Sequence, residues 1–167
     1  MSSLLVLGGA RSGKSRYAQQ RIERNAGELA FIATAQPLDT EMKQRIERHQ
    51  CDRGPRWHTI DAPIDLVNAI ADADRHADAI LVDCVTLWLS NLILTDRPVP
   101  ARELCEAISQ SRRPVALVSN EVGCGIVPEN SLARRFRDEA GRLNQQIAAS
   151  ADEVVMIVAG LPLILKP

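Results

Sequence analysis

The chain has 167 residues, of which 46% are hydrophobic and 25% are charged, and its formal net charge is -1. These values are typical of one globular domain that is large enough to bury a core, so we expect a single domain over residues 1–167. The balanced charge and an aromatic content of only 3% argue against nucleic acid as a partner, because the chain offers neither a basic surface nor base-stacking side chains.

The four cysteines form no C-x-x-C pair, which argues against a zinc site and favours reduced thiols. They are Cys51, Cys84, Cys105 and Cys124. The longest apolar run, residues 154–165, is too short to span a bilayer and is interrupted by Gly160 and Pro162. The first apolar residues resemble no signal peptide. The sequence therefore predicts a cytoplasmic protein with no membrane insertion.

Short apolar runs alternate along the chain with longer segments of helical period, a pattern typical of a parallel sheet covered by helices. Strands are expected at residues 4–7, 29–34, 57–60, 79–83, 115–120 and 153–159. Helices are expected at residues 14–25, 39–51, 64–74, 85–94, 101–111 and 131–149. The sequence predicts an α/β fold with a mostly parallel sheet and helices on both faces.

In a sheet of this kind ligands bind at the carboxyl ends of the strands, so the polar residues that follow the strands are candidate ligand contacts. Those residues are Gly8 to Ser15, then Thr34, Ala35 and Gln36, then Asp61, then Asp83, and finally Asn120 and Glu121.

Residues 8–15 read GGARSGKS and match the phosphate-loop pattern G-x-x-x-x-G-K-S between an apolar strand and a helix. Gly8 and Gly13 allow backbone conformations in which successive N–H groups point at phosphate oxygens. Lys14 is expected to reach the β- and γ-phosphates, and the Ser15 hydroxyl to ligate Mg²⁺. The predicted nucleotide contacts are Gly8, Gly9, Ala10, Arg11, Ser12, Gly13, Lys14 and Ser15. The pattern predicts a loop that binds a nucleoside triphosphate in a P-loop NTPase-like (RecA-like) fold, and the loop alone does not choose between the classes of protein that use it.

Asp83 closes an apolar strand, where a phosphate-loop protein carries its second Mg²⁺-organising carboxylate. Asp is also a favoured N-cap, so Asp83 could instead cap the helix that follows. The two roles are compatible.

His49 lies in the expected helix 39–51, on one face with Met42 and Ile46. That spacing alone favours a core histidine. The alternative is a nucleophile, because a neutral imidazole nitrogen can attack a phosphoryl group and carry it covalently. His58 and His76 have weaker cases for a catalytic role.

Several segments together make the chain resemble a known family. They are GGARSGKSRYA, IATAQPLDTEMKQRIERHQ, the WHTID segment and SNEVGCGIVPENSLARRFRDEAGRLNQQIAASADEV. The chain resembles, over essentially its whole length, the bifunctional adenosylcobinamide kinase / adenosylcobinamide-phosphate guanylyltransferase family of cobalamin biosynthesis. The histidine helix and the last segment are specific to this family, whereas the phosphate loop is shared far more widely.

The resemblance implies two reactions. The first phosphorylates the aminopropanol hydroxyl of adenosylcobinamide with ATP or GTP. The second attaches GMP from GTP to an enzyme histidine, releases pyrophosphate, and passes the GMP to the phosphorylated product to give adenosylcobinamide-GDP. The resemblance also implies a homo-oligomer, a trimer.

The family's guanylylated histidine falls on His49, which changes the interpretation of that residue from core histidine to nucleophile. With Lys14, it completes the implied catalytic pair. The implied nucleotide-binding positions are Gly8 to Ser15, Thr34, Ala35, Gln36, Gln50, Cys51, Asp52, Arg53, Asp61 and Asp83. Many of these are the strand-end positions already selected by topology. Ser15 and Asp83 are the Mg²⁺ ligands expected from the phosphate-loop pattern.

The sequence departs from the family in two places: residues 95–100 are shorter than in many members, and Arg48 stands where some members carry a second histidine. Two other functions are compatible with the loop alone. One is a single-function small-molecule kinase in which His49 is inert. The other is a nucleotide-gated regulatory binding module. The loop at residues 120–130 is as compatible with a substrate contact as with a plain connection.

Overall fold

The computed structural model of the chain describes residues 2–36 and 54–167. The helix expected at 39–51 and the predicted site residues His49, Gln50, Cys51, Asp52 and Arg53 lie outside the described residues.

The described elements follow in the order β1 (Ser3–Gly8), α1 (Lys14–Ile22), β2 (Leu29–Ala33), β3 (Trp57–Asp61), α3 (Leu66–His76), β4 (Ala79–Asp83), α4 (Val85–Leu94), α5 (Ala101–Gln110), β5 (Val115–Asn120), α6 (Ser131–Ser150), β6 (Glu153–Val158) and β7 (Leu161–Lys166).

The strands form one seven-stranded sheet in the order β3-β2-β4-β5-β1-β6-β7. Neighbouring strands from β3 to β6 run parallel, and β7 runs antiparallel to β6. Parallel strands are connected by crossovers, which puts helices over both faces of the sheet. The predicted α/β fold with a mostly parallel sheet is confirmed.

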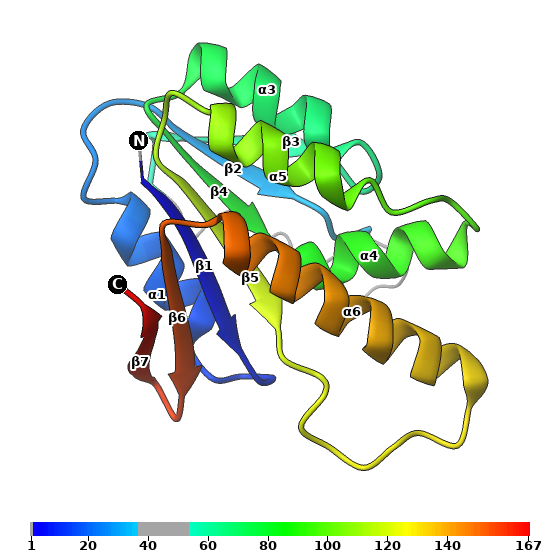
Figure 1. Cartoon of the computed structure of the whole chain (residues 1–167). Coiled ribbons are helices and arrows are strands. Elements are labelled where there is room, and N and C mark those ends of the chain that lie inside the picture. Colours follow the sequence, from blue (N-terminus) through cyan, green and yellow to red (C-terminus); the bar gives the residue numbers. More distant parts are fainter. Residues whose placement is uncertain (1, 37–53) are drawn as a thin grey trace.

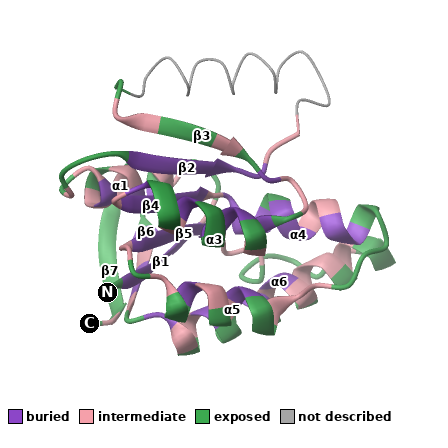
Figure 2. Ribbon diagram, turned by 90° about the horizontal axis from the view of Figure 1, so that it is seen from above, coloured by how far each residue is buried: buried purple, intermediate pink, exposed green. Residues whose placement is uncertain are grey.

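Helices cover the two faces unequally (Figures 1 and 2). Helix α1 packs through Ala18 and Ile22 on one face, against apolar side chains of β1, β2, β4, β5 and β6. Helices α3, α4, α5 and α6 cover the other face. Strand β1 is buried along its whole length because it is covered from both sides.

The boundaries agree with the sequence predictions to within three residues, and 79–83, 85–94 and 115–120 coincide with β4, α4 and β5. Strand β7 was not predicted. Gly160, at a φ of 81°, turns the chain after β6, and the apolar run that follows returns as an edge strand whose side chains stay exposed. A continuous apolar run with Pro162 inside it does not show the alternation typical of a half-buried strand.

Within residues 2–36 and 54–167, no helix combines the length and the apolar character that a membrane span requires. No three His, Cys, Asp or Glu side chains there gather closely enough to hold a metal ion. Cys84, Cys105 and Cys124 are free thiols.

Candidate nucleotide site at the carboxyl ends of the strands

The phosphate loop leaves β1 at Gly8 and enters α1 after Gly13. A Cβ atom on Gly8 would lie 2.6 Å from Ser12 Oγ and 2.8 Å from the carbonyl oxygen of Ile157, so only glycine fits there. Gly13 precedes the first helical residue with a φ of 97°, in the left-handed region that glycine occupies without strain. Arg11 also has a positive φ, 55°, which the sequence pattern did not predict.

Two hydrogen bonds hold the phosphate loop, one from within the loop and one from the C-terminal hairpin. The Lys14 side chain is 9% exposed, and its Nζ donates a hydrogen bond to the carbonyl oxygen of Gly9 at 3.0 Å. The ammonium therefore lies across the loop rather than in solvent. On the outside, the N–H of Gly160 in the β6–β7 turn donates to the Ser12 carbonyl oxygen at 3.0 Å. The C-terminal hairpin thus supports the phosphate loop.

Ser15 and Asp83 meet although they are 68 positions apart in the chain. The Ser15 hydroxyl donates to Asp83 Oδ1 at 3.3 Å, from the first turn of α1 to the last residue of β4. The N-cap of α4 is Cys84, not Asp83. Asp83 therefore does not cap α4, and its carboxylate is paired with the Ser15 hydroxyl.

A buried polar contact fixes the backbone beside Asp83. Thr34 is fully buried, and its Oγ1 donates to the Cys84 carbonyl oxygen at 2.7 Å and accepts from the Cys84 N–H at 2.9 Å. Asn91 Nδ2 donates to the carbonyl oxygens of Thr34 and Pro63 at 2.8 and 2.9 Å. Burial, reinforced by the neighbouring Asp83 carboxylate, raises the pKa of the Cys84 thiol, which stays protonated at neutral pH.

The register of the strands brings the other predicted positions to the same edge. Gly8 is opposite Asn120, and Ala33 is opposite both Asp83 and Asp61. Asp61 therefore lies at this edge but on the outer strand β3, well along the sheet from the phosphate loop. Ala35 and Gln36, which follow β2, are half-buried.

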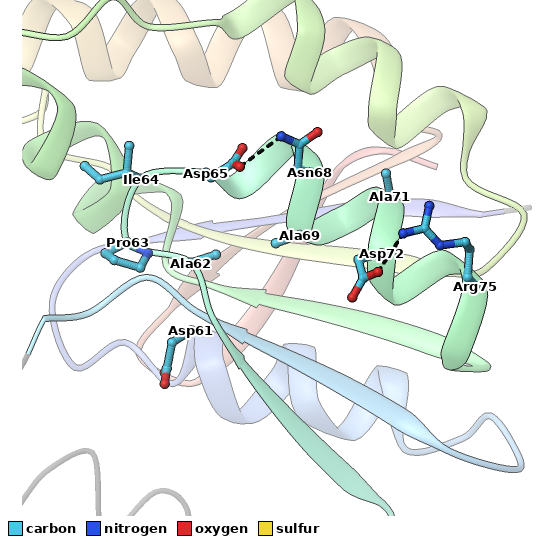
Figure 3. A pocket seen from close by; sticks show the side chains of 10 residues that line it. All are labelled: Asp61, Ala62, Pro63, Ile64, Asp65, Asn68, Ala69, Ala71, Asp72 and Arg75. Atoms are coloured by element: carbon cyan, nitrogen blue, oxygen red, sulfur yellow. Dashed lines mark hydrogen bonds and ion pairs between the residues drawn. The ribbon is translucent and has the colours of Figure 1, made fainter.

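An open pocket of about 610 Å³ adjoins Asp61 and runs along α3 (Figure 3). The Asp65 carboxylate accepts from Asn68 at 2.9 Å, and Arg75 pairs with Asp72 at 2.6 Å, whereas the Asp61 side chain points away from α3. None of the phosphate-loop residues lines this pocket. The pocket therefore lies beside the β3 end of the sheet, apart from the phosphate loop.

The loop at residues 121–130 projects from the end of β5 into solvent, with Ile126 96% exposed. Arg134 donates from Nη1 to the carbonyl oxygens of Pro128 and Glu129, so α6 braces the end of the loop. The two described histidines are exposed, and His58 lies 2.7 Å from Glu28. Neither is near the strand ends that form the site.

Sequence reasoning missed a buried polar cluster under Asn120. Thr86, Ser119 and Asn144 lie in an otherwise apolar layer. Ser119 contacts both Thr86 and Asn144, and these two contact the Asn120 backbone. One signal was present in the sequence: Asn144 follows the core residue Leu143, at a helix position that faces the sheet.

Comparison with known proteins shows to which family of phosphate-loop proteins the chain belongs. Residues 4–165 match the family model described as cobinamide kinase / cobinamide phosphate guanyltransferase. The chain belongs to that family. The match covers nearly the whole chain and confirms the resemblance inferred from the sequence.

Curated relatives of the chain are described as bifunctional adenosylcobalamin biosynthesis proteins. The bifunctional adenosylcobalamin biosynthesis protein CobP of Pseudomonas aeruginosa is 43% identical over 166 residues, which cover 97% of this chain and 96% of CobP. The bifunctional adenosylcobalamin biosynthesis proteins CobU of Salmonella typhimurium and of Escherichia coli are 41% and 39% identical, each covering 98% of this chain and 99% of the relative. The chain is thus a bifunctional kinase and guanylyltransferase of cobalamin biosynthesis.

Proposed function

We propose that both reactions of this family use the one phosphate loop at Gly8 to Ser15, with two different phosphorus atoms attacked. In the first, the hydroxyl of the adenosylcobinamide aminopropanol arm attacks the γ-phosphorus of ATP or GTP, and the nucleoside diphosphate leaves. In the second, GMP passes from GTP to the phosphorylated cobinamide through His49. The conformation of the loop, with its buried Lys14, is the observation that supports this proposal most directly.

The loop residues take the phosphate charge in both reactions. The N–H groups of the loop and of the first turn of α1 point toward phosphate oxygens and are aided by the positive end of the helix. Lys14 contacts the β- and γ-phosphates and, as a catalytic residue, stabilises the charge that develops on the leaving group. Its contact with Gly9 keeps the ammonium over the loop in readiness for this role.

Ser15 and Asp83 are the residues that would hold Mg²⁺. Their hydroxyl and carboxylate oxygens lie 3.3 Å apart and are the hard donors that this ion prefers. Two protein ligands are sufficient, because Mg²⁺ takes its remaining ligands from phosphates and water. When bound, the ion neutralises charge on the phosphates.

The nucleoside is assigned to the side of the edge that leads from the loop toward β3. Thr34, Ala35 and Gln36 follow β2, Gln50 to Arg53 precede β3, and Asp61 ends it. Thr34 contributes by fixing the backbone beside Asp83, since its hydroxyl is already used there. Asp61, at the end of the outer strand, is suited to bind donor groups of the base or ribose.

The guanylyl transfer proceeds in two displacements at the α-phosphorus. The neutral imidazole of His49 attacks that phosphorus, a nitrogen–phosphorus bond forms, and the bond to the β-phosphate breaks, releasing pyrophosphate. A phosphate oxygen of the cobinamide phosphate then attacks the same phosphorus, and the nitrogen–phosphorus bond breaks. Free imidazole has a pKa near 6.5, so a histidine is largely neutral and nucleophilic at pH 7.

The test is to trap the covalent nucleotide. We expect protein incubated with Mg²⁺ and GTP labelled at the α-phosphate to retain the label after denaturation, and the label to be labile in acid and stable in base. His49→Ala should retain none, while still transferring the γ-phosphate to cobinamide. His76→Ala, at an exposed position in α3, is the matched control and should label normally. An unlabelled wild-type protein that still phosphorylates cobinamide would leave the single-function kinase as the better description.

We further propose that the chain acts as one cytoplasmic domain assembled into a homo-oligomer, a trimer by its family resemblance. Strand β7 is the observation that supports a homo-oligomer, because it is an edge strand with several exposed apolar side chains. They include Leu161, Leu163, Ile164 and Leu165. Large exposed apolar patches usually mark interaction surfaces.

A further inference from the structure

Three of the buried polar side chains in the described part of the chain form a hydrogen-bonded cluster beside Asn120. They are Thr86 of α4, Ser119 of β5 and Asn144 of α6, each no more than 6% exposed. Helices α4 and α6 pack on each other and on the same face of the sheet, so the cluster lies between layers of the fold (Figure 1). None of the three belongs to the phosphate loop or to the strand-end positions expected to bind the nucleotide.

The cluster holds both backbone groups of Asn120. The Asn120 N–H donates to Thr86 Oγ1 at 2.6 Å, and Asn144 Nδ2 donates to the Asn120 carbonyl oxygen at 3.2 Å. Ser119 Oγ donates to Asn144 Oδ1 at 2.7 Å and lies 3.1 Å from Thr86 Oγ1. Each hydroxyl and amide of the cluster therefore has a partner.

Such a cluster is a poor way to gain stability. Polar groups in an apolar layer lose their hydration, and replacing hydrogen-bonded partners with apolar groups of the same shape is often nearly neutral for stability. What a fully bonded cluster does achieve is a single, well-defined position for the backbone it contacts. Here that backbone is the last residue of β5.

The alternation along β5 decides where the Asn120 side chain points. Ser119 faces α4 and α6, so Asn120 faces the opposite side, as do Ala116 and Val118, which pack in the layer of α1. Asn120 is directly opposite Gly8, and the next residue, Glu121, donates its N–H to the Gly8 carbonyl oxygen at 3.1 Å. The carboxamide is thus held on the face of the sheet where the phosphate loop turns into α1.

The Asn120 carboxamide is half-buried and makes no hydrogen bond to any other residue of 2–36 or 54–167. Strand β5 lies between β1, which carries the phosphate loop, and β4, which ends in Asp83. The amide therefore stands between the loop and the carboxylate assigned to Mg²⁺, and away from the nucleoside side at β3.

We propose that the Asn120 carboxamide binds the γ-phosphate of the triphosphate, with Nδ2 donating to a γ-oxygen, and that Thr86, Ser119 and Asn144 position it. This inference rests on the proposed function in one respect, that Gly8 to Ser15 hold the triphosphate. Asn120 is then a catalytic residue for γ-phosphoryl transfer, and the three buried residues are positioning residues. The nucleoside diphosphate, which has no γ-phosphate, does not use the contact.

The test compares the affinities of ATP and ADP, measured by calorimetry with Mg²⁺ in the absence of cobinamide. Loss of one hydrogen bond to a charged oxygen should weaken ATP binding to Asn120→Ala by about tenfold and leave ADP binding within about twofold of the wild type. The kcat for phosphoryl transfer to cobinamide should fall as well. Equal weakening for ATP and ADP, or no weakening for either, would overturn the inference.

Thr86 supplies a matched pair of variants that leaves Asn120 intact. Thr86→Val keeps the shape of the side chain and removes the hydroxyl, and we expect it to lower the preference for ATP over ADP. Thr86→Ser keeps the hydroxyl and should restore that preference. Identical ATP to ADP ratios in the two variants would show that the cluster does not position Asn120.

The outcomes separate this inference from the function on which it rests. Wild-type protein that binds neither nucleotide would overturn both. Normal nucleotide binding with an unchanged ATP to ADP ratio in Asn120→Ala would overturn the inference alone, and the labelling of His49 with GMP is measured independently.

Discussion

At the scale of single residues, the phosphate loop depends on close approaches that leave no room for a side chain at Gly8. The loop folds back on the end of β1, so that Ser12 Oγ and the Ile157 carbonyl oxygen occupy the space a Cβ would need. The Ile157 carbonyl belongs to the adjacent strand and cannot move aside without disturbing the sheet. The conformation that receives phosphate is therefore set by the packing under the loop as well as by the glycines themselves.

We predict that Gly8→Ala displaces the loop and weakens ATP binding by at least about tenfold, while the protein stays folded with a loss of about 1–3 kcal/mol in the free energy of unfolding. Calorimetric titration and urea unfolding measure the two effects. Gly141→Ala is the control, because a Cβ there meets no atom within 4 Å and lies in helix α6, where alanine is favoured over glycine. Wild-type ATP affinity in Gly8→Ala would contradict the role assigned to the close approach.

At the scale of elements, the β6–β7 hairpin contacts the phosphate loop and also forms one edge of the sheet. Its turn supports the phosphate loop through the Gly160 N–H, and β7 pairs with β6 on one side only. The other side of β7 is the edge of the sheet, where backbone N–H and C=O groups are left for another chain. Apolar side chains on such an edge favour association.

We predict that Leu163→Lys on β7 lowers the mass of the assembly toward that of the single chain, because the ammonium must be buried if the edge is an interface. Sedimentation equilibrium measures the mass. Leu163 is 53% exposed, so the single chain should stay folded. Leu94→Lys, at a 65% exposed position in α4, is the control and should leave the mass unchanged. An unaltered mass in Leu163→Lys would place the interface elsewhere.

At the scale of the whole molecule, one sheet joins two apolar layers. The layer under α3, α4, α5 and α6 includes Trp88, which is fully buried and donates its indole N–H to the Ile64 carbonyl oxygen at 2.7 Å. The layer of α1 includes Phe31, against which Trp57 packs edge-on, with ring centroids 6.2 Å apart. Because the same strands line both layers, neither layer can unfold while the other stays intact.

We therefore predict a single cooperative unfolding transition, as expected for one domain. The two tryptophans report on different layers, so Trp57→Phe leaves Trp88 as the only indole and Trp88→Phe leaves Trp57. In each variant, the midpoint in urea from tryptophan fluorescence should coincide with that from far-ultraviolet circular dichroism. Separate midpoints for the two probes would indicate that the layers form independent units.

Much of the fold could be predicted because the sequence patterns are local. The apolar runs of β4 and β5 and the periodic apolar positions of α4 and α6 specify elements without reference to the rest of the chain. Strand β7 could not be predicted in this way. Its side chains are exposed and it exists because β6 offers it an open edge, which is a property of the assembled sheet.

The candidate site shows the same division. The phosphate loop can be recognised from eight consecutive residues. The rule that ligands bind at the carboxyl ends of strands selected Asp83 and Asn120 as neighbours of the loop. No local pattern could show that Thr86, Ser119 and Asn144 meet under Asn120, because the three belong to three elements and are brought together only by packing.

The sequence alone thus determined the fold class, the family, the phosphate loop and which polar residues follow each strand. Each of these is encoded in contiguous residues or in motifs of fixed spacing. The tertiary structure alone decided that Ser15 lies 3.3 Å from Asp83, that the C-terminal hairpin supports the loop, and that a buried cluster fixes Asn120 opposite Gly8. These are contacts between residues far apart in the chain, and they follow from strand register and layer packing, which no local pattern specifies.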